Sequence, residues 1–212
     1  MVDWRQISFT GVAFVSDQGV NTGRRRFLTA STTAVGAVGA GYVAVPFVAS
    51  WNPSAKAKAA GAPVKWDISK LEPGAMVTVE WRGKPVYIVR RTEESLASIE
   101  KLTDAVDDPQ SAKSIQPDYV DPSQRAIRAE YLVLVGLCTH LGCAPKYRPE
   151  VGAADLGGDE WLGGFFCPCH GSKFDLAGRV YKSVPAPTNL EVPPYRFETD
   201  SIVVIGEDEE TA

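Results

Sequence analysis

The hydrophobic pattern of the chain begins with one long apolar run. Residues 27–55 carry no charged side chain. Because a helix rises about 1.5 Å per residue, the stretch Phe27–Trp51 would reach roughly 37 Å, which exceeds the roughly 30 Å of hydrocarbon in a bilayer. Pro46 lies near the far end, where a kink is tolerated if neighbours cover the backbone. The pattern therefore predicts one transmembrane helix.

Beyond residue 63 the apolar positions recur with period two. Residues 76–81 and 86–90 flank the turn Arg82–Pro85, which predicts a hairpin. Thr92 is placed to cap a short helix that continues to Leu102, and the apolar run 131–137 predicts a buried strand. Further strands are expected at 161–166, 179–181 and 201–205. Short strands and turns with one short helix predict a mainly β fold of stacked antiparallel sheets.

Three cations stand directly before the apolar run, at Arg24, Arg25 and Arg26. By the positive-inside rule they place the N-terminal side in the cytoplasm. The string Arg24-Arg25-Arg26-Phe27-Leu28 also resembles a twin-arginine export signal. The apolar core of a cleaved signal is typically about 7–15 residues long, and this run is much longer. We therefore expect a retained anchor in the inner membrane that crosses it once.

These features divide the chain into four expected segments. A cytoplasmic leader that contains the start of the export signal occupies 1–23, and the transmembrane anchor occupies 24–51. Residues 52–63 hold an Ala/Lys run bracketed by Pro and Gly, which predicts a flexible hinge because so short a helix is marginal alone; a passive linker is the alternative. Residues 64–212 form the periplasmic domain.

Composition bears on the partner of the protein and on the position of its site. The net charge is −4 and no basic stripe occurs, which excludes a nucleic-acid partner on grounds of charge. The four cysteines and two histidines of the chain all lie in two boxes, Cys138–Cys143 and Cys167–Ser172. Scattered core cysteines would not segregate in this way, so the two boxes are expected to build one site.

Thiolate and imidazole ligands in short loops leave three chemistries open. A structural zinc ion would take two Cys and two His, although six candidate ligands exceed the four that it needs. A Cys/His nucleophile pair would leave the second box unexplained. An iron–sulfur cluster with mixed ligation fits the number of ligands best.

The two boxes, Cys-Thr-His-Leu-Gly-Cys and Cys-Pro-Cys-His-Gly-Ser, resemble the two signatures of Rieske proteins residue for residue. Rieske proteins carry a [2Fe–2S] cluster in which two His replace two Cys on one iron. The resemblance implies that Cys138 and Cys167 bind one iron and that His140 and His170 bind the other. It also implies a Rieske-type β-sandwich with an inserted cluster-binding subdomain at about 133–187.

The second Cys of each box narrows the resemblance. The resemblance implies that these two cysteines, Cys143 and Cys169, form a disulfide, which an exported domain permits. A chain with both cysteines is similar to the high-potential members found in quinol-oxidising complexes. Similarity continues through the anchor and hinge, residues 83–85 and residues 185–193. The chain thus resembles the iron–sulfur subunits of proteobacterial ubiquinol–cytochrome c reductase.

This resemblance implies a function in the respiratory chain. Such a subunit oxidises ubiquinol at the quinol site of cytochrome b and passes the electron to cytochrome c1, which supports the proton-motive force. The chain would then be one subunit of an oxidoreductase and translocase, held in membrane lipid within a dimeric complex. Its soluble domain would lie in the periplasm, and its hinge would let that domain move between partners.

The resemblance also assigns roles to single residues. His170 would face the quinol as the catalytic residue, and Leu141 would form part of the apolar tip that docks on cytochrome b. Pro185 would belong to a loop that covers the cluster, and Ser172 would donate a hydrogen bond to a bridging sulfide. Phe174 departs from the pattern, since many members have Tyr there with its hydroxyl on a ligand sulfur; we expect a lower reduction potential for this reason.

Two other functions remain open at this level. The Rieske small subunit of a periplasmic molybdenum oxidase, such as arsenite oxidase, is a fixed relay, and the long span and hinge argue against it. A zinc-stabilised binding module without catalysis would contain zinc in place of iron and acid-labile sulfide.

Overall fold

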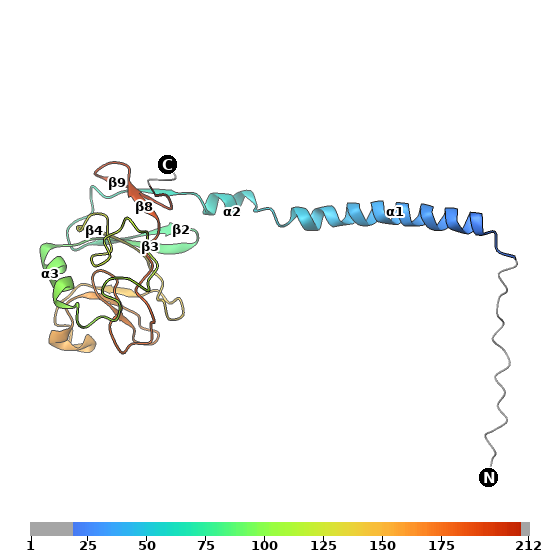
Figure 1. Ribbon diagram of the computed structural model, residues 1–212. Coiled ribbons are helices and arrows are strands. Elements are labelled where there is room, and N and C mark those ends of the chain that lie inside the picture. Colours follow the sequence, from blue (N-terminus) through green and yellow to red (C-terminus); the bar gives the residue numbers. More distant parts are fainter. Residues whose placement is uncertain (1–18, 209–212) are drawn as a thin grey trace, which may run out of the picture. The chain divides into compact units, whose positions relative to one another are not determined.

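The structure is a computed structural model and describes residues 19–208. The chain divides into two compact units, Met1–Pro53 and Ser54–Ala212. Most of the predicted leader, residues 1–18, lies outside the described residues. Figure 1 shows the elements, whose bounds are α1 Thr22–Ala49, α2 Ala55–Ala60, β1 Val64–Asp67, β2 Met76–Trp81, β3 Lys84–Arg90, α3 Glu93–Lys101, β4 Tyr131–Val135, β5 Lys146–Arg148, η3 Ala154–Leu156, η4 Gly158–Glu160, β6 Gly164–Phe166, β7 Lys173–Phe174, β8 Tyr195–Phe197 and β9 Ile202–Ile205.

The first unit contains the predicted apolar helix, α1. The side chain of Asn21 caps it by accepting a hydrogen bond from the backbone N–H of Arg24 at 3.0 Å, and Pro46 lies inside its last turn. The helix is long and apolar enough to cross a membrane. Its bounds lie two residues before the expected span 24–51 at each end. That it is a retained anchor stays a prediction.

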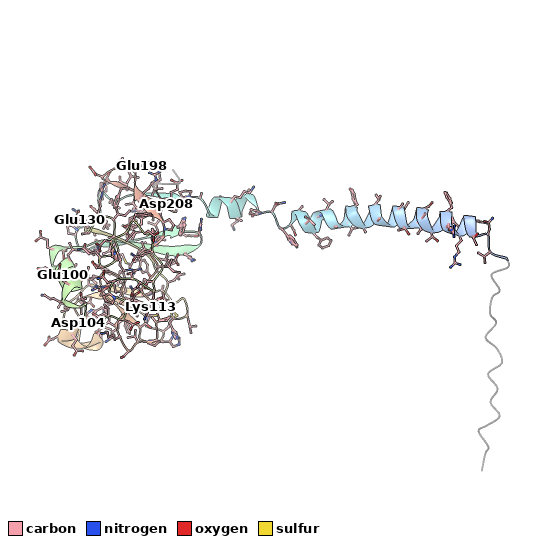
Figure 2. All side chains as sticks on the ribbon, viewed as in Figure 1. Glu100, Asp104, Lys113, Glu130, Glu198 and Asp208 are labelled. Atoms are coloured by element: carbon pink, nitrogen blue, oxygen red, sulfur yellow. A yellow bond between two sulfur atoms is a disulfide. The ribbon has the colours of Figure 1, made fainter. Side chains whose placement is uncertain are left out.

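In the described part of the second unit, the strands form three antiparallel sheets of three strands each, ordered β1-β9-β8, β2-β3-β4 and β5-β6-β7. The mainly β, antiparallel class is therefore confirmed. The expected hairpin is β2–β3, whose turn residues Arg82 and Gly83 both have positive φ, as a turn matched to the twist of the strands requires. Charged residues such as Glu100, Glu130 and Lys113 are exposed on this unit (Figure 2).

Other expected elements are present with altered bounds. Helix α3 is capped by the Thr92 side chain, which accepts from Ser95 N at 3.1 Å. The apolar run 131–137 forms a strand only as far as Val135, whose N–H donates to Glu191 O at 2.8 Å as the chain turns away. The strand expected at 179–181 is reduced to isolated bridges of Val180 and Tyr181.

The main hydrophobic core draws buried residues from all three sheets. Most side chains of β3 and β4 are buried. The ring of Tyr87 on β3 stacks on Phe165 on β6 with centroids 5.9 Å apart, and its hydroxyl donates to Pro145 O at 2.9 Å. Tyr87 thereby joins the β2-β3-β4 sheet to the loops that carry the two boxes.

Candidate metal centre

The first box follows the end of β4. Gly136 leads into it and packs against the Tyr87 ring, since a Cβ at this position would lie 2.4 Å from Cζ of Tyr87. The box then closes on itself. Cys138 N donates to Cys143 O at 2.8 Å, and Gly142 N donates to Cys138 O at 2.8 Å. These bonds turn the chain so that the residues between them project from one tight loop.

The second box connects β6 to β7 and repeats this hydrogen-bond pattern. Cys167 N donates to Ser172 O at 2.8 Å, and Gly171 N donates to Cys167 O at 3.0 Å. Gly171 has a φ of 78° and Gly142 has a φ of 80°, which is the region that glycine adopts without strain. The fifth residue of each box is therefore glycine for the same reason, and the two boxes form equivalent loops.

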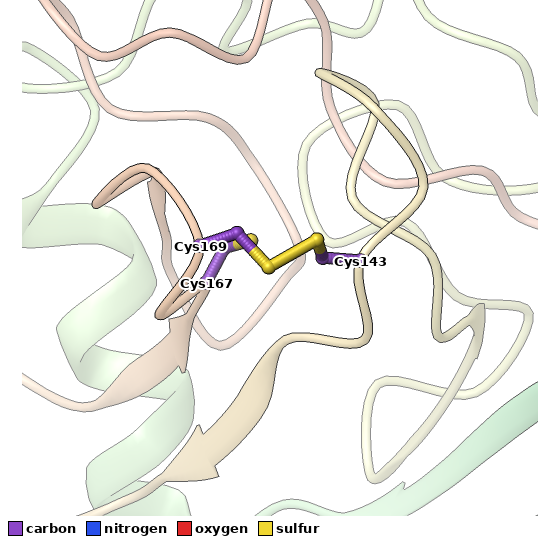
Figure 3. A group of neighbouring side chains, drawn as sticks. All are labelled: Cys143, Cys167 and Cys169. Carbon is purple, nitrogen blue, oxygen red and sulfur yellow. A yellow bond between two sulfur atoms is a disulfide. The ribbon is translucent and has the colours of Figure 1, made fainter.

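A disulfide joins the two loops. Cys143 and Cys169 are bonded in the structure (Figure 3), as the resemblance implied. The sulfur of Cys167 lies beside this bond, and the three sulfurs fall within 4.8 Å of one another. These three do not form a metal site, because the two bonded sulfurs have no thiolate to offer. The disulfide instead fixes the loops around the remaining cysteines.

The remaining two cysteines are free, buried and adjacent. Burial raises the pKa of the Cys138 thiol, and the neighbouring Cys167 thiol raises it further, whereas the backbone N–H of His140 and the Ser172 hydroxyl act in the opposite direction. A positive metal ion favours the deprotonated form of such thiols. Two buried thiols in contact thus form one half of a ligand set.

The two histidines form the other half. The rings of His140 and His170 lie edge to face with their centroids 4.7 Å apart. His140 is half-buried and His170 is exposed. The site therefore has sulfur donors inside and imidazoles at the surface. Beside them on the first loop, the Leu141 side chain is 71% exposed.

The other expected site residues lie on the second box, on β7 and in the segment that begins at Pro185. Ser172 is buried, and its Oγ accepts a hydrogen bond from Ala186 N at 3.1 Å. Pro185, the residue before Ala186, is exposed. Phe174 is buried and pairs with Phe165 in the sheet β5-β6-β7. The loop after Pro185 thus contacts the second box through Ser172.

Sequence reasoning missed three groups that position the loops. Thr139 Oγ1 donates to Thr188 O at 2.7 Å and ties the first box to the loop after Pro185. Tyr87 fixes both ends of the first box, and the turn Asp175–Arg179 follows directly after β7. The contacts of Thr139 and Tyr87 have no local signal, because their partners lie 49 and 58 positions away; the turn Asp175–Arg179 is local, and its Asp followed by Gly178 could have indicated it.

This donor set fits a [2Fe–2S] cluster. Two adjacent sulfur donors on one side and two neighbouring imidazoles on the other match the ligands of the Rieske centre, in which one iron is held by Cys and one by His. The buried position of the thiols also suits a cluster shielded from water.

Comparisons with known proteins agree with this chemistry. The model described as "Rieske [2Fe-2S] domain" matches residues 64–195, and the model described as "Ubiquitinol-cytochrome C reductase Fe-S subunit TAT signal" matches residues 15–54. The chain is 60% identical over 198 residues to the ubiquinol-cytochrome c reductase iron-sulfur subunit of Allochromatium vinosum, with 93% of this chain and 95% of that protein covered.

Two further relatives carry the same name. The protein from Rhodospirillum rubrum is 44% identical, with 90% of this chain and 96% of that protein covered. The protein from Blastochloris viridis is 46% identical, with 86% of this chain and 92% of that protein covered. The similarity therefore extends over nearly the whole length of each protein.

Proposed function

The chain belongs to the family of Rieske iron–sulfur subunits of ubiquinol–cytochrome c reductase, and we propose from this premise how its residues take part in the oxidation of ubiquinol. It is an electron-transfer subunit of an oxidoreductase complex and carries a [2Fe–2S] cluster. Its partners are cytochrome b and cytochrome c1. The relatives' names favour this function over that of a molybdenum oxidase subunit.

We assign the ligands by their positions. The buried Cys138 and Cys167 would hold one iron, and His140 and His170 would hold the other. The adjacency of the two buried thiols and of the two imidazole rings supports this assignment. When bound, the cluster supplies one-electron transfer at a potential that imidazole ligation raises above that of all-Cys clusters.

The single observation that carries the proposal is the exposure of His170 beside Leu141. The His170 ring nitrogen that is not used as a ligand accepts the hydrogen bond of a quinol hydroxyl and holds its proton. The Leu141 side chain supplies an apolar contact that excludes water from the docked surface of cytochrome b. Pro185 belongs to the loop that covers the opposite side of the site.

Ser172 orients one further hydrogen bond. Its Oγ accepts from Ala186 N, which leaves its own hydrogen free to donate to sulfur. Such a donor favours the reduced, more negative state of a bound cluster. The proline-rich loop thereby fixes the direction in which Ser172 donates.

The location follows from the first unit. The arginines at 24–26 and helix α1 support a single-pass anchor in the inner membrane with unit 2 in the periplasm. The boundary between the two compact units falls at Pro53 and Ser54, inside the proposed hinge 52–63. We further propose that the subunit lies in contact with membrane lipid in a dimeric complex.

Electron paramagnetic resonance on dithionite-reduced membranes tests the proposal. We expect a [2Fe–2S] signal with nitrogen coupling that changes when a quinol-site inhibitor is added. Leu141→Ala should weaken the response to the inhibitor, whereas Val151→Ala, at a position that is also exposed, should leave it intact. A signal without nitrogen coupling, or one that ignores the inhibitor, would contradict the proposal.

A further inference from the structure

Unit 2 buries an unusual excess of positive charge around one turn. Arg91, Arg125 and Arg179 are at most 3% exposed, and Asp175 is fully buried with them. Charged side chains are rarely buried this completely without a partner. Burial lowers the pKa of Arg91 and that of Arg125 to about 10, so both stay protonated at neutral pH.

The single carboxylate of this group is used within its own turn. Asp175 Oδ2 accepts from Arg179 Nε at 2.7 Å, while Oδ1 accepts from the backbone N–H groups of Ala177 and Arg179. Arg179 also donates to Ile99 O on helix α3. Asp175 and Arg179 therefore form a neutral buried pair.

The other two guanidiniums bind only neutral oxygens of the described residues. Arg91 Nη1 donates to Leu176 O at 3.3 Å, and Arg125 Nη1 donates to the carbonyls of Ala177 and Gly178, at 3.3 Å each. In the described part of the chain, neither takes part in a salt bridge. Their Nη2 atoms are buried without a hydrogen-bond partner there. Both guanidiniums are thus fixed in the interior against three consecutive carbonyls. The carboxylates that act on them, Asp175 on both, Asp108 on Arg125 and Asp121 on Arg91, do so without a salt bridge within the described residues.

This turn follows the second box in the chain and contacts the strand that leads into the first box. It begins three residues after Ser172, and Gly178 O accepts from Leu190 N at 2.9 Å in the segment beyond Pro185. A Cβ at Gly178 would lie 2.6 Å from Leu134 and 3.2 Å from Arg125 Nη1, and Leu134 is on β4, which leads into the first box. The turn that the two cations hold therefore contacts segments that support the candidate metal centre.

We propose that Arg91 and Arg125 are positioning residues that raise the reduction potential of the cluster through their buried positive charge, an inference that rests on the proposed function. A reduced cluster carries one more negative charge than an oxidised one, so a nearby cation favours reduction. The electrostatic influence of these cations extends through the interior, because charges are screened less there than in water. This explains why the turn is held by cations where neutral donors would satisfy the same carbonyls.

The test is a redox titration of membranes containing the full chain, followed by electron paramagnetic resonance. Arg125→Gln should lower the midpoint potential, and Arg125→Lys, which keeps the charge, should restore most of it. Arg128→Gln is the matched control, because Arg128 lies in the same segment but is partly exposed and paired with Asp200; we expect no shift. The Arg125→Gln shift should also persist at high salt, since buried charges are little screened.

A second variant should shift the midpoint potential in the opposite direction. Asp175→Asn keeps the Oδ1 acceptor but removes the negative charge that acts on both Arg91 and Arg125, so the midpoint potential should rise. General damage to the fold would not lower the midpoint potential in one variant and raise it in the other. If Arg125→Gln does not accumulate, Arg91→Gln takes its place: it should lower the midpoint potential, whereas Asp175→Asn should raise it.

Equal shifts for Arg125→Lys and Arg125→Gln, a rise or no change in the Gln variants, or a fall with Asp175→Asn would overturn the inference. These readings do not depend on quinol. An intact nitrogen-coupled signal that ignores the quinol-site inhibitor would count against the proposed function, whereas unshifted midpoints with a normal inhibitor response would count against this inference alone.

Discussion

At the scale of single residues, Phe174 shows how one missing hydroxyl affects the site. Its ring is buried on β7 and pairs with Phe165, at the position where the resemblance to Rieske proteins led us to expect Tyr. A phenol there would donate to a ligand sulfur and favour the reduced state. Phe174→Tyr should therefore raise the midpoint potential in a redox titration. Phe197→Tyr adds a hydroxyl in the separate β1-β9-β8 sheet and should not; an unchanged midpoint in Phe174→Tyr would refute the argument.

Gly164 is a residue whose missing side chain is required by the backbone. Its φ is 157°, and a Cβ would lie 2.0 Å from Phe174 O and 3.0 Å from Asp175 Cα. Because neither backbone atom can move without disturbing β7, Gly164→Ala should cost about 3 kcal/mol or more. Gly152→Ala is the control, since Gly152 also has positive φ but an open surrounding, and should cost about 1 kcal/mol. Urea unfolding measures both, and equal costs would contradict the steric reason.

At the scale of elements, the Asp108 carboxylate holds one turn of the long segment between α3 and β4. Asp108 accepts hydrogen bonds from Ala112 N, Lys113 N and Ser114 Oγ at 2.8, 3.0 and 2.7 Å. Burial raises the pKa of Asp108, but these three hydrogen bonds outweigh it, so the pKa lies below the usual value of 3.8. The charged form therefore stabilises the folded state.

The sign of the pH dependence follows from this lowered pKa. A carboxyl that is more acidic when folded contributes its stability above the unfolded pKa of about 3.9 and loses it as the pH falls through the folded pKa. Asp108→Asn should cost roughly 1–2 kcal/mol at pH 7, and the gap from the unsubstituted protein should close below about pH 3.9. Asp104→Asn, at an exposed position, should show no such gap. Urea unfolding at several pH values tests this, and a constant gap down to pH 3 would exclude it.

Elements with local signals were predicted well from sequence, whereas contacts between distant segments were not. The β2–β3 hairpin, the Thr92 cap and the two boxes each depend on neighbouring residues, and their positions were predicted closely. Asn189 Nδ2, by contrast, donates to Asp108 O across 81 positions of sequence, and Tyr87 reaches Pro145 across 58. No pattern in one sequence pairs such residues. The two boxes could therefore be located from the sequence, but the groups that position them could not.

At the scale of the whole molecule, the junction between the two compact units contains a short helix whose stability can be adjusted. Helix α2 is capped by Ser54 Oγ, which accepts from Ala57 N at 3.1 Å, and ends at Gly61. The φ of Gly61 is −85°, and a Cβ would meet only carbonyl oxygens at 3.5 and 3.7 Å. Alanine therefore fits at this position without strain.

Gly61→Ala tests whether the junction must bend for turnover. The substitution favours the helix by about 1 kcal/mol, or roughly fivefold in the helix–coil equilibrium. If the proposed hinge carries unit 2 between cytochrome b and cytochrome c1, turnover with ubiquinol should fall severalfold while the midpoint potential and the resonance spectrum stay unchanged. Ala57→Gly weakens the same helix and should leave turnover at least as fast. Equal turnover in both variants would show that the stiffness of α2 does not limit electron delivery, since a rigid and a loosened junction would then serve the partners alike.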